Sequence, residues 1–142
     1  MIKFTITGTL PTLNKVNKAN RTHWSKGARL KKEYEDLIKW QITRVSPVAD
    51  DDYPVVVAVR WFDPNNKRDA DNVIAGNKML LDAMVAMEIL RDDSRKYVEN
   101  VVSLGVETDA KNPRIEVFLF SRHEARKTCP YCNSCLQTWK ED

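Results

Sequence analysis

The chain has 142 residues, of which 42% are hydrophobic and 30% charged, and its formal net charge is +3. This length suits one domain with a core of its own and excludes two compact domains. No window approaches the roughly 20 apolar residues of a membrane span, so we expect a cytoplasmic protein with no membrane partner.

Charge is distributed unevenly along the chain. The first acidic residue is Glu33, and eight Lys and Arg residues precede it. Such segregation predicts a basic surface beside an acidic pocket. Because Lys and Arg bind phosphates by releasing counterions, a polyanion is one candidate partner. A solvated helix face is the plainer alternative.

The first third of the chain predicts a strand, a loop and a helix. Residues 2–7 alternate apolar with polar side chains, which is typical of a half-buried strand. Residues 12–23 are rich in Asn, Lys and Thr without apolar periodicity, which favours a loop. From Ser25 we expect an amphipathic helix that ends before Pro47. Its predicted apolar face consists of Leu30, Tyr34, Leu37, Ile38 and Ile42.

The middle of the chain predicts a buried strand followed by a second helix. Residues 55–62 form a continuous β-branched run, as expected of a strand covered on both faces. The helix that follows stays apolar-periodic as far as Leu90. It takes its N-cap from Asp69, Asp71 or Asn72.

Two further segments, residues 97–107 and 114–120, are strand-like and could pair as a hairpin through the turn between them. We therefore predict an α+β fold with a single small domain over residues 1–121. A mixed sheet of about four strands packs with two main helices in this domain. The composition shifts after it, so residues 122–142 are predicted to form a short Cys-rich tail.

Carboxylates recur around the second predicted helix. Asp69 and Asp71 precede it, Lys78 and Asp82 are i, i+4 neighbours along it, and Asp93 follows it. On a continuous helix Asp71, Lys78 and Asp82 share one stripe, whereas Asp93 must fold back toward the helix start. Mg²⁺ is usually held by one or two carboxylates plus substrate phosphates. The pattern thus predicts metal-assisted phosphodiester chemistry, with helix capping by the first two aspartates as the alternative.

The same residues resemble the RusA family of Holliday junction resolvases over about residues 3–121. That family's pattern is Arg-Asp-x-Asp-Asn, then a helix with Lys and an Asp-Ala-Leu-like triplet, then an Asp-Asp pair. The matching residues in this chain are Arg68, Asp69, Asp71, Asn72, Lys78, Asp82, Ala83, Met84, Asp92 and Asp93.

The resemblance implies a homodimer that binds four-way DNA junctions and nicks two strands symmetrically with Mg²⁺ or Mn²⁺. It assigns metal binding and catalysis to Asp69, Asp71 and Asp93, and the family's essential lysine to Lys78. The spacing from Asn72 to Lys78 departs from the family pattern, because it is longer by about one helical turn.

A second predicted site is the basic lead-in before Glu33. Its cations suit sequence-independent contact with DNA phosphates. The predicted DNA-binding residues are Lys15, Lys18, Arg21, Lys26 and Arg29.

The three cysteines of the chain, Cys129, Cys132 and Cys135, lie within seven residues. The first two form a CxxC pair, which is typical of thiolates that bind a tetrahedral Zn²⁺, and His123 could supply a fourth ligand. The alternatives are a redox CxxC and a tail with inert cysteines.

The sequence therefore predicts an Mg-dependent endodeoxyribonuclease that resolves Holliday junctions or related branched DNA in recombination and repair. Two alternatives remain open. One is a non-catalytic nucleic-acid-binding adaptor with a zinc knuckle, in which the aspartates cap a helix. The other is a nuclease of the same fold that acts on flaps or other branched DNA.

Overall fold

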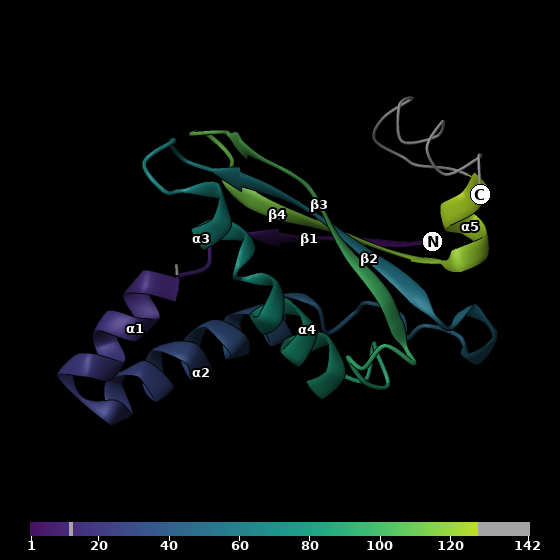
Figure 1. The fold of residues 1–142 in the computed structure, drawn as a ribbon, viewed down its shortest axis with the longest axis horizontal. Coiled ribbons are helices and arrows are strands. Elements are labelled where there is room, and N and C mark those ends of the chain that lie inside the picture. The colour runs from purple at the N-terminus through teal and green to yellow at the C-terminus, as the bar shows by residue number, and fades with distance from the viewer. Residues whose placement is uncertain (12, 128–142) are drawn as a thin grey trace.

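The computed structural model of the chain describes residues 1–11 and 13–127 (Figure 1). It confirms the predicted α+β class, with a four-stranded mixed sheet in the order β1-β4-β2-β3. The strands are β1 (Ile2–Thr7), β2 (Val55–Asp63), β3 (Val98–Thr108) and β4 (Arg114–Ser121). Strand β1 has the bounds that its alternating pattern predicts.

The main helices gather on one side of the sheet, and α5 lies at one end of it beside the N-terminus (Figure 1). The helical segments are α1 (Leu13–Thr22), α2 (Trp24–Gln41), the 3₁₀ turn η1 (Asp50–Asp52), α3 (Ala70–Ile74), α4 (Asn77–Ala86) and α5 (Arg122–Lys127). No helix in the described part of the chain is long and apolar enough to span a membrane.

Helix α1 replaces the loop that we predicted for residues 12–23, so that prediction is wrong. Few of its residues are apolar, and it packs against α2. A Cβ atom on Gly27 would lie 1.5 Å from Oδ1 of Asn20, so the missing side chain lets α1 and α2 approach closely. Tertiary packing therefore overrides a local pattern that favours a loop.

Helix α2 confirms the amphipathic helix predicted from Ser25, but one residue of the predicted apolar face is exposed to solvent. Ile38 and Ile42 are each 1% exposed, whereas Leu37 is 57% exposed. Successive helical residues differ by about 100°, so Leu37 lies off the stripe that carries Ile38 and Ile42. Its assignment to the core face is wrong.

The predicted hairpin of β3 and β4 is also wrong. Strand β3 pairs in parallel with β2, and β4 lies between β1 and β2, antiparallel to both. Helices α3 and α4 connect β2 to β3, because parallel strands need a crossover connection. Strand β4 is buried from Val117 to Ser121, as a central strand should be, and β2 is covered on both faces as predicted.

The main core lies between the helices and one face of the sheet. Alternate residues of β2 and β4 point into it, because strand side chains alternate between the two faces. Large side chains that are at most 2% exposed line this core: Trp61, Ile38, Ile42, Leu80, Met84, Ile115 and Leu119.

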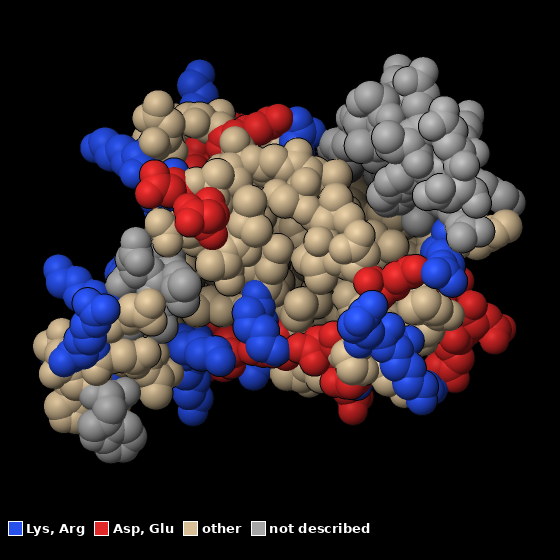
Figure 2. Space-filling view, viewed as in Figure 1, with Lys and Arg blue, Asp and Glu red and all other residues tan. Residues whose placement is uncertain are grey.

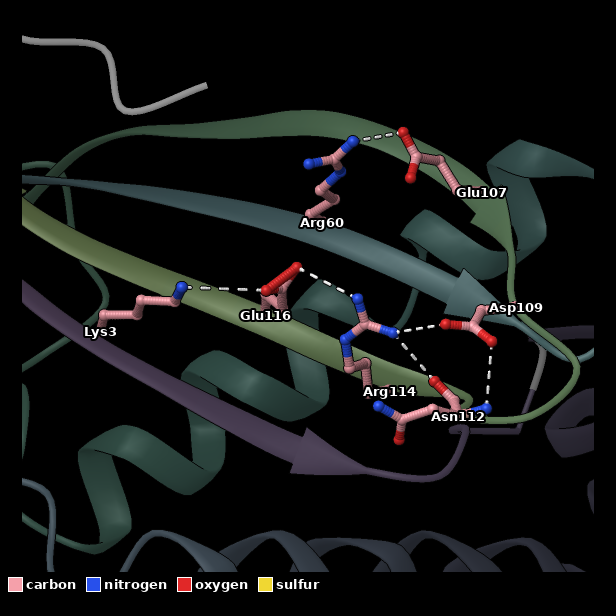
Figure 3. Close-up of polar contacts among 7 residues, drawn as sticks. All are labelled: Lys3, Arg60, Glu107, Asp109, Asn112, Arg114 and Glu116. Atoms are coloured by element: carbon pink, nitrogen blue, oxygen red, sulfur yellow. Dashed lines mark hydrogen bonds and ion pairs between the residues drawn. The ribbon is translucent and has the colours of Figure 1, made fainter. Parts of the chain in front are cut away.

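The opposite face of the sheet carries a row of ion pairs near one end of the strands (Figure 3). Nη1 of Arg114 lies 2.8 Å from Oδ2 of Asp109, and Glu116 lies 3.9 Å from both Arg114 and Lys3. The Arg114 guanidinium also stacks 3.7 Å from the centre of the Phe62 ring. Charged side chains therefore cover this part of the sheet with their apolar stems.

Strand β1 forms one edge of the sheet, and α2 protects part of that edge. Oε1 of Gln41 accepts a hydrogen bond from the Thr7 backbone N–H at 2.7 Å. Its Nε2 donates to the Thr7 carbonyl at 3.4 Å. The side-chain amide thus bonds both backbone groups of Thr7.

Helix α5 begins where the sequence predicts the tail to begin, and it is attached to the sheet. Ser121 N donates to Oε2 of Glu124 at 3.0 Å, and Glu124 N donates back to Oγ of Ser121 at 3.2 Å. This reciprocal pair is a capping box. The N-terminal ammonium of Met1 lies 2.7 Å from Oε1 of Glu124 and holds the pKa of that carboxyl below its usual value.

Candidate acidic site and its basic neighbours

The acidic site begins with a buried ion pair that fixes the segment after β2. Asp63 ends the strand and is 3% exposed. Arg68 binds both of its carboxylate oxygens, with Nε 2.7 Å from Oδ2. Arg68 Nη1 also donates to the carbonyl of Leu10 at 2.6 Å. One guanidinium therefore joins the end of β2 to the segment that leads into α1, directly before Asp69.

Asp69 stands at the N-cap position of α3, but its side chain does not cap the helix. Its backbone is extended, with φ −66° and ψ 143°, and its side chain makes no capping hydrogen bond. The carboxylate is exposed to solvent. Capping, which is the plain alternative for this residue, therefore does not account for its carboxylate.

Asp71 is also exposed, in the first turn of α3. Its Oδ1 accepts a hydrogen bond from the Asn72 backbone N–H at 2.9 Å. Within the described residues, neither Asp69 nor Asp71 forms an ion pair. Two negative charges thus stand close in sequence with no cation from the described residues to neutralise them.

The single helix predicted after Asp71 is interrupted at Ala75 and Gly76, so the continuous stripe from Asp71 to Lys78 is a wrong expectation. A Cβ atom on Gly76 would lie 2.8 Å from Cη2 of Trp61. The chain passes directly over the buried indole at this point, and glycine permits the approach. Lys78 therefore belongs to a new helix, α4.

Helix α4 also ends earlier than predicted, at Ala86. Glu88 adopts a positive φ of 59°, and the N–H groups of Ile89 and Leu90 both donate to the carbonyl of Met84. The chain reverses here, while Leu90 stays buried in the core at 1% exposure. This reversal returns the following residues toward the start of α4.

Asp93 folds back after this reversal, and its partner is Lys78. Lys78 Nζ lies 2.6 Å from Oδ2 of Asp93 and 2.9 Å from Oδ1 of Asp82. These two hydrogen bonds, the one to Asp93 first, raise the pKa of the Lys78 ammonium above its usual value. Lys78 is thus held as a cation and is unsuited to act as a general base.

Helix α2 extends this cluster of charges. Nζ of Lys31 lies 3.7 Å from Oδ2 of Asp82 and 3.7 Å from Oε1 of Glu35. Asp82 therefore contacts cations from two helices, which suits it to orient Lys78. Neighbouring Asp92 has a different environment, since a hydrogen bond from the Ser94 side chain lowers the pKa of its carboxyl.

The predicted three-carboxylate metal site is not assembled in this conformation. Asp93 joins Lys78 and Asp82, whereas Asp69 and Asp71 lie at the start of α3. Across residues 1–11 and 13–127, no three His, Cys, Asp or Glu side chains form a group that could hold a metal ion.

The predicted DNA-binding residues are all exposed on α1 and α2. Because α1 is a helix and not a loop, Lys15, Lys18 and Arg21 follow one another within about 120° of its circumference. Lys26 and Arg29 are similarly spaced on α2. On the face shown in Figure 2, basic side chains gather over α1 and acidic ones lie over α3. The two predicted sites are thus neighbours in space.

Asp63 is the residue that the sequence interpretation missed, because the predicted strand ends one residue before it, at residue 62. A charged residue at the end of a largely apolar strand is the signal that could have revealed it, since such a residue needs a partner when buried. For the predicted zinc site, Cys129, Cys132 and Cys135 lie outside the described residues. His123 is exposed in the first turn of α5.

No protein-family model matches the chain, and a search of curated proteins finds no match.

Proposed function

We propose that this protein is a metal-dependent endodeoxyribonuclease that nicks four-way junctions or related branched DNA. The observation that carries the proposal is the pair of exposed carboxylates, Asp69 and Asp71, which have no cation partner among the described residues and lie beside the basic helix α1. The resemblance to the RusA pattern supports the same reaction and the same aspartates.

Mg²⁺ or Mn²⁺ fits the chemistry of Asp69 and Asp71. Both offer hard oxygen donors, and Mg²⁺ usually needs one or two carboxylates with phosphates of the substrate completing its shell. Asp93 would supply a third carboxylate if its ion pair with Lys78 opened. The bound ion would polarise the phosphate and lower the pKa of the attacking water.

In this proposal Lys78 supplies a positive charge to the reaction once Asp93 has left it for the metal ion. Lys78 remains protonated beside Asp93 and Asp82. Its side chain is 65% exposed, so it can reach a phosphate that approaches the surface. We assign it to neutralise the negative charge that builds up on the phosphate in the transition state. Asp82 is a positioning residue, because it acts through Lys78.

DNA is bound in this proposal by the cations of α1 and α2, whose contact with phosphates is independent of sequence. Paired nicks on opposite strands require two copies of the site. We therefore propose a homodimer with twofold symmetry, matching the symmetry of a four-way junction. Lys15, Lys18, Arg21, Lys26 and Arg29 would form its DNA-binding surface.

A labelled four-way junction tests this function directly. The protein is incubated with the junction, a three-way flap substrate and a matched linear duplex, each with Mg²⁺, Mn²⁺ or EDTA. We expect paired, symmetric nicks on the junction in either metal and no nicks in EDTA. Nicks that favour the flap would instead assign the flap-nuclease alternative. Tight binding to the junction without nicks in either metal would overturn the enzymatic proposal.

One observation favours the adaptor as a second candidate function. Asp93 is paired with Lys78, so the three predicted metal ligands are not gathered together. A protein that only binds nucleic acid needs no such gathering, while it would still use the basic helices. In that case junction binding would be independent of metal, and the Asp69 and Asp71 carboxylates would be dispensable.

A further inference from the structure

A pocket of about 280 Å³ opens between the basic helix α1 and the segment that leads into Asp69. Four parts of the chain form its walls: the loop after β1, α1, α2 and the turn after β2. The lining residues that matter for its chemistry are Leu10, Pro11, Lys15, Tyr34, Asn65 and Arg68.

The floor of the pocket is already organised without a ligand. Arg68 uses Nε and Nη2 on the two carboxylate oxygens of Asp63, and Nη1 on the carbonyl of Leu10. These bonds fix the pocket wall relative to the residue that follows, Asp69. A ligand in this pocket would therefore have a defined position beside the acidic site.

The charges that line the pocket favour an anion. Lys15 and Arg68 are two cations, and Asp63 is the single carboxylate among the lining residues. Because Arg68 is bound to Asp63, these two charges offset each other. The two cations and one carboxylate give the lining residues a net charge of +1, which favours an anion such as a phosphate.

The size and walls of the pocket suit one nucleotide. Complete ligand sites usually measure about 300–1,000 Å³, so this pocket suits a single base and is too small for a duplex. Leu10, Pro11 and the Tyr34 ring give it apolar and aromatic walls, on which a base can pack. Oδ1 of Asn65 accepts from the Lys67 N–H at 3.0 Å, which leaves its Nδ2 as a donor for the edge of a base.

We propose that this pocket binds one unstacked nucleotide of the DNA strand, with its base against Tyr34 and its phosphate near Lys15. The proposal rests on the proposed nuclease function, because it makes this nucleotide the neighbour of the phosphate that is cut. Branched DNA supplies such nucleotides at its branch point, whereas an intact duplex must pay to unstack one. The pocket thus contributes to the choice of branched over linear DNA.

The first test needs no cleavage. The full-length protein is titrated in EDTA with each deoxynucleoside monophosphate, with deoxyribose 5-phosphate and with inorganic phosphate, while backbone amide signals are followed by NMR. We expect saturable shifts at Thr9, Leu10 and Asn65 with the monophosphates, and about tenfold weaker binding of deoxyribose 5-phosphate. Equal binding of the sugar phosphate, or shifts that avoid these three residues, would overturn the base pocket.

Two pocket variants and one control sharpen the result. Tyr34→Ala removes the aromatic wall, and Asn65→Ala removes the amide from an exposed turn that does not contribute to the core. Each should weaken monophosphate binding, Tyr34→Ala by about tenfold. The control is Trp40→Ala, since Trp40 is an aromatic residue of α2 that is 77% exposed and lies outside the pocket. An equal loss in the Trp40 variant would contradict the assignment.

A second test links the pocket to the reaction. Junctions with one abasic site at each position around the nick are cut by the wild-type protein and by Asn65→Ala. We expect one abasic position to slow the wild-type protein and to have a smaller effect in the variant. Monophosphate binding without nicking of any junction would refute the proposed function. Nicking that no abasic site affects would refute the pocket proposal alone.

Discussion

The carboxylates at the start of α3 and the carboxylates around Lys78 of α4 differ in whether a cation is bound to them. Asp69 and Asp71 are exposed and form no ion pair with another described residue. Asp82 and Asp93 share the ammonium of Lys78. The carboxylates at the start of α3 can therefore accept an external cation, whereas Asp82 and Asp93 already have one within the protein. We therefore expect a metal ion to bind at α3, and Lys78 to contact a phosphate once Asp93 has left it for that metal ion.

The largest expected effect is the loss of nicking when a carboxylate of α3 is removed. Asp71→Asn removes a metal ligand while keeping the shape of the side chain. We expect junction nicking to fall by about 10³-fold or more. Junction binding should be unchanged or tighter, because one negative charge is lost. Nicking rates and gel-shift affinities measure the two effects.

The matched control is Asp51→Asn, because Asp51 is an exposed aspartate in η1. That variant should nick at the wild-type rate. Full nicking activity of Asp71→Asn would show that the carboxylates of α3 do not bind the catalytic metal, and it would overturn the proposed site.

The next effect is a loss of stability when the Asp63–Arg68 ion pair before α3 is broken. Arg68→Met leaves Asp63 buried at 3% exposure without its partner. We expect the free energy of unfolding to fall by about 3 kcal/mol, because an uncompensated charge remains buried. Urea denaturation of Arg68→Met measures the loss.

Two further variants separate the cost of the unpaired Asp63 charge from other effects of replacing an arginine. Asp63→Asn combined with Arg68→Met should recover part of the stability, since neither charge is then left alone. Arg95→Met replaces an exposed arginine and should cost little. A loss no larger than that of Arg95→Met would show that the Asp63–Arg68 pair does not stabilise this segment.

A smaller effect is expected from breaking the α4 cluster. Lys78→Met removes the cation and releases Asp93. We expect the maximal nicking rate to fall about tenfold, while the Mg²⁺ concentration for half-maximal rate falls, because Asp93 becomes free to bind metal. A series of nicking rates against Mg²⁺ concentration tests both statements.

Asp82→Asn provides the comparison for that variant. It keeps the bond between Lys78 and Asp93, so the Mg²⁺ dependence should stay close to that of the wild type. If Lys78→Met left both the rate and the Mg²⁺ dependence unchanged, the ion pair would have no role in the reaction.

The smallest effects are expected from single cations on α1. Lys18→Gln or Arg21→Gln should each lower the slope of log affinity against log salt concentration by about 0.9. Junction and duplex should be weakened alike, because phosphate contacts carry no sequence information. Lys111→Gln, in the exposed connection between β3 and β4, should leave the slope unchanged. An equal change in that control would place DNA binding elsewhere.

Local patterns predicted those parts of the fold in which neighbouring residues determine the outcome. The alternation of residues 2–7 predicts β1, and the continuous β-branched run of residues 55–62 predicts a strand covered on both faces. The hairpin prediction was wrong although the turn between β3 and β4 is compatible with pairing. The crossover through α3 and α4 places β2 between these two strands. That arrangement depends on contacts between residues far apart in sequence.

The candidate site shows the same limit. The family pattern predicted which aspartates to examine, and the returning chain does bring Asp93 to the start of α4. The interruption at Gly76 depends on Trp61, and the position of Arg68 depends on Asp63 and Leu10. Neither could be deduced from helical periodicity, because each partner belongs to a different element of the fold.

The bond between Gln41 and Thr7 has a consequence for how this protein behaves at high concentration. An exposed sheet edge is a template on which another chain can add a strand and begin to aggregate. At Thr7 the Gln41 amide already takes the N–H and the carbonyl that such a strand would need. Strand addition along β1 is therefore blocked at the C-terminal end of this edge.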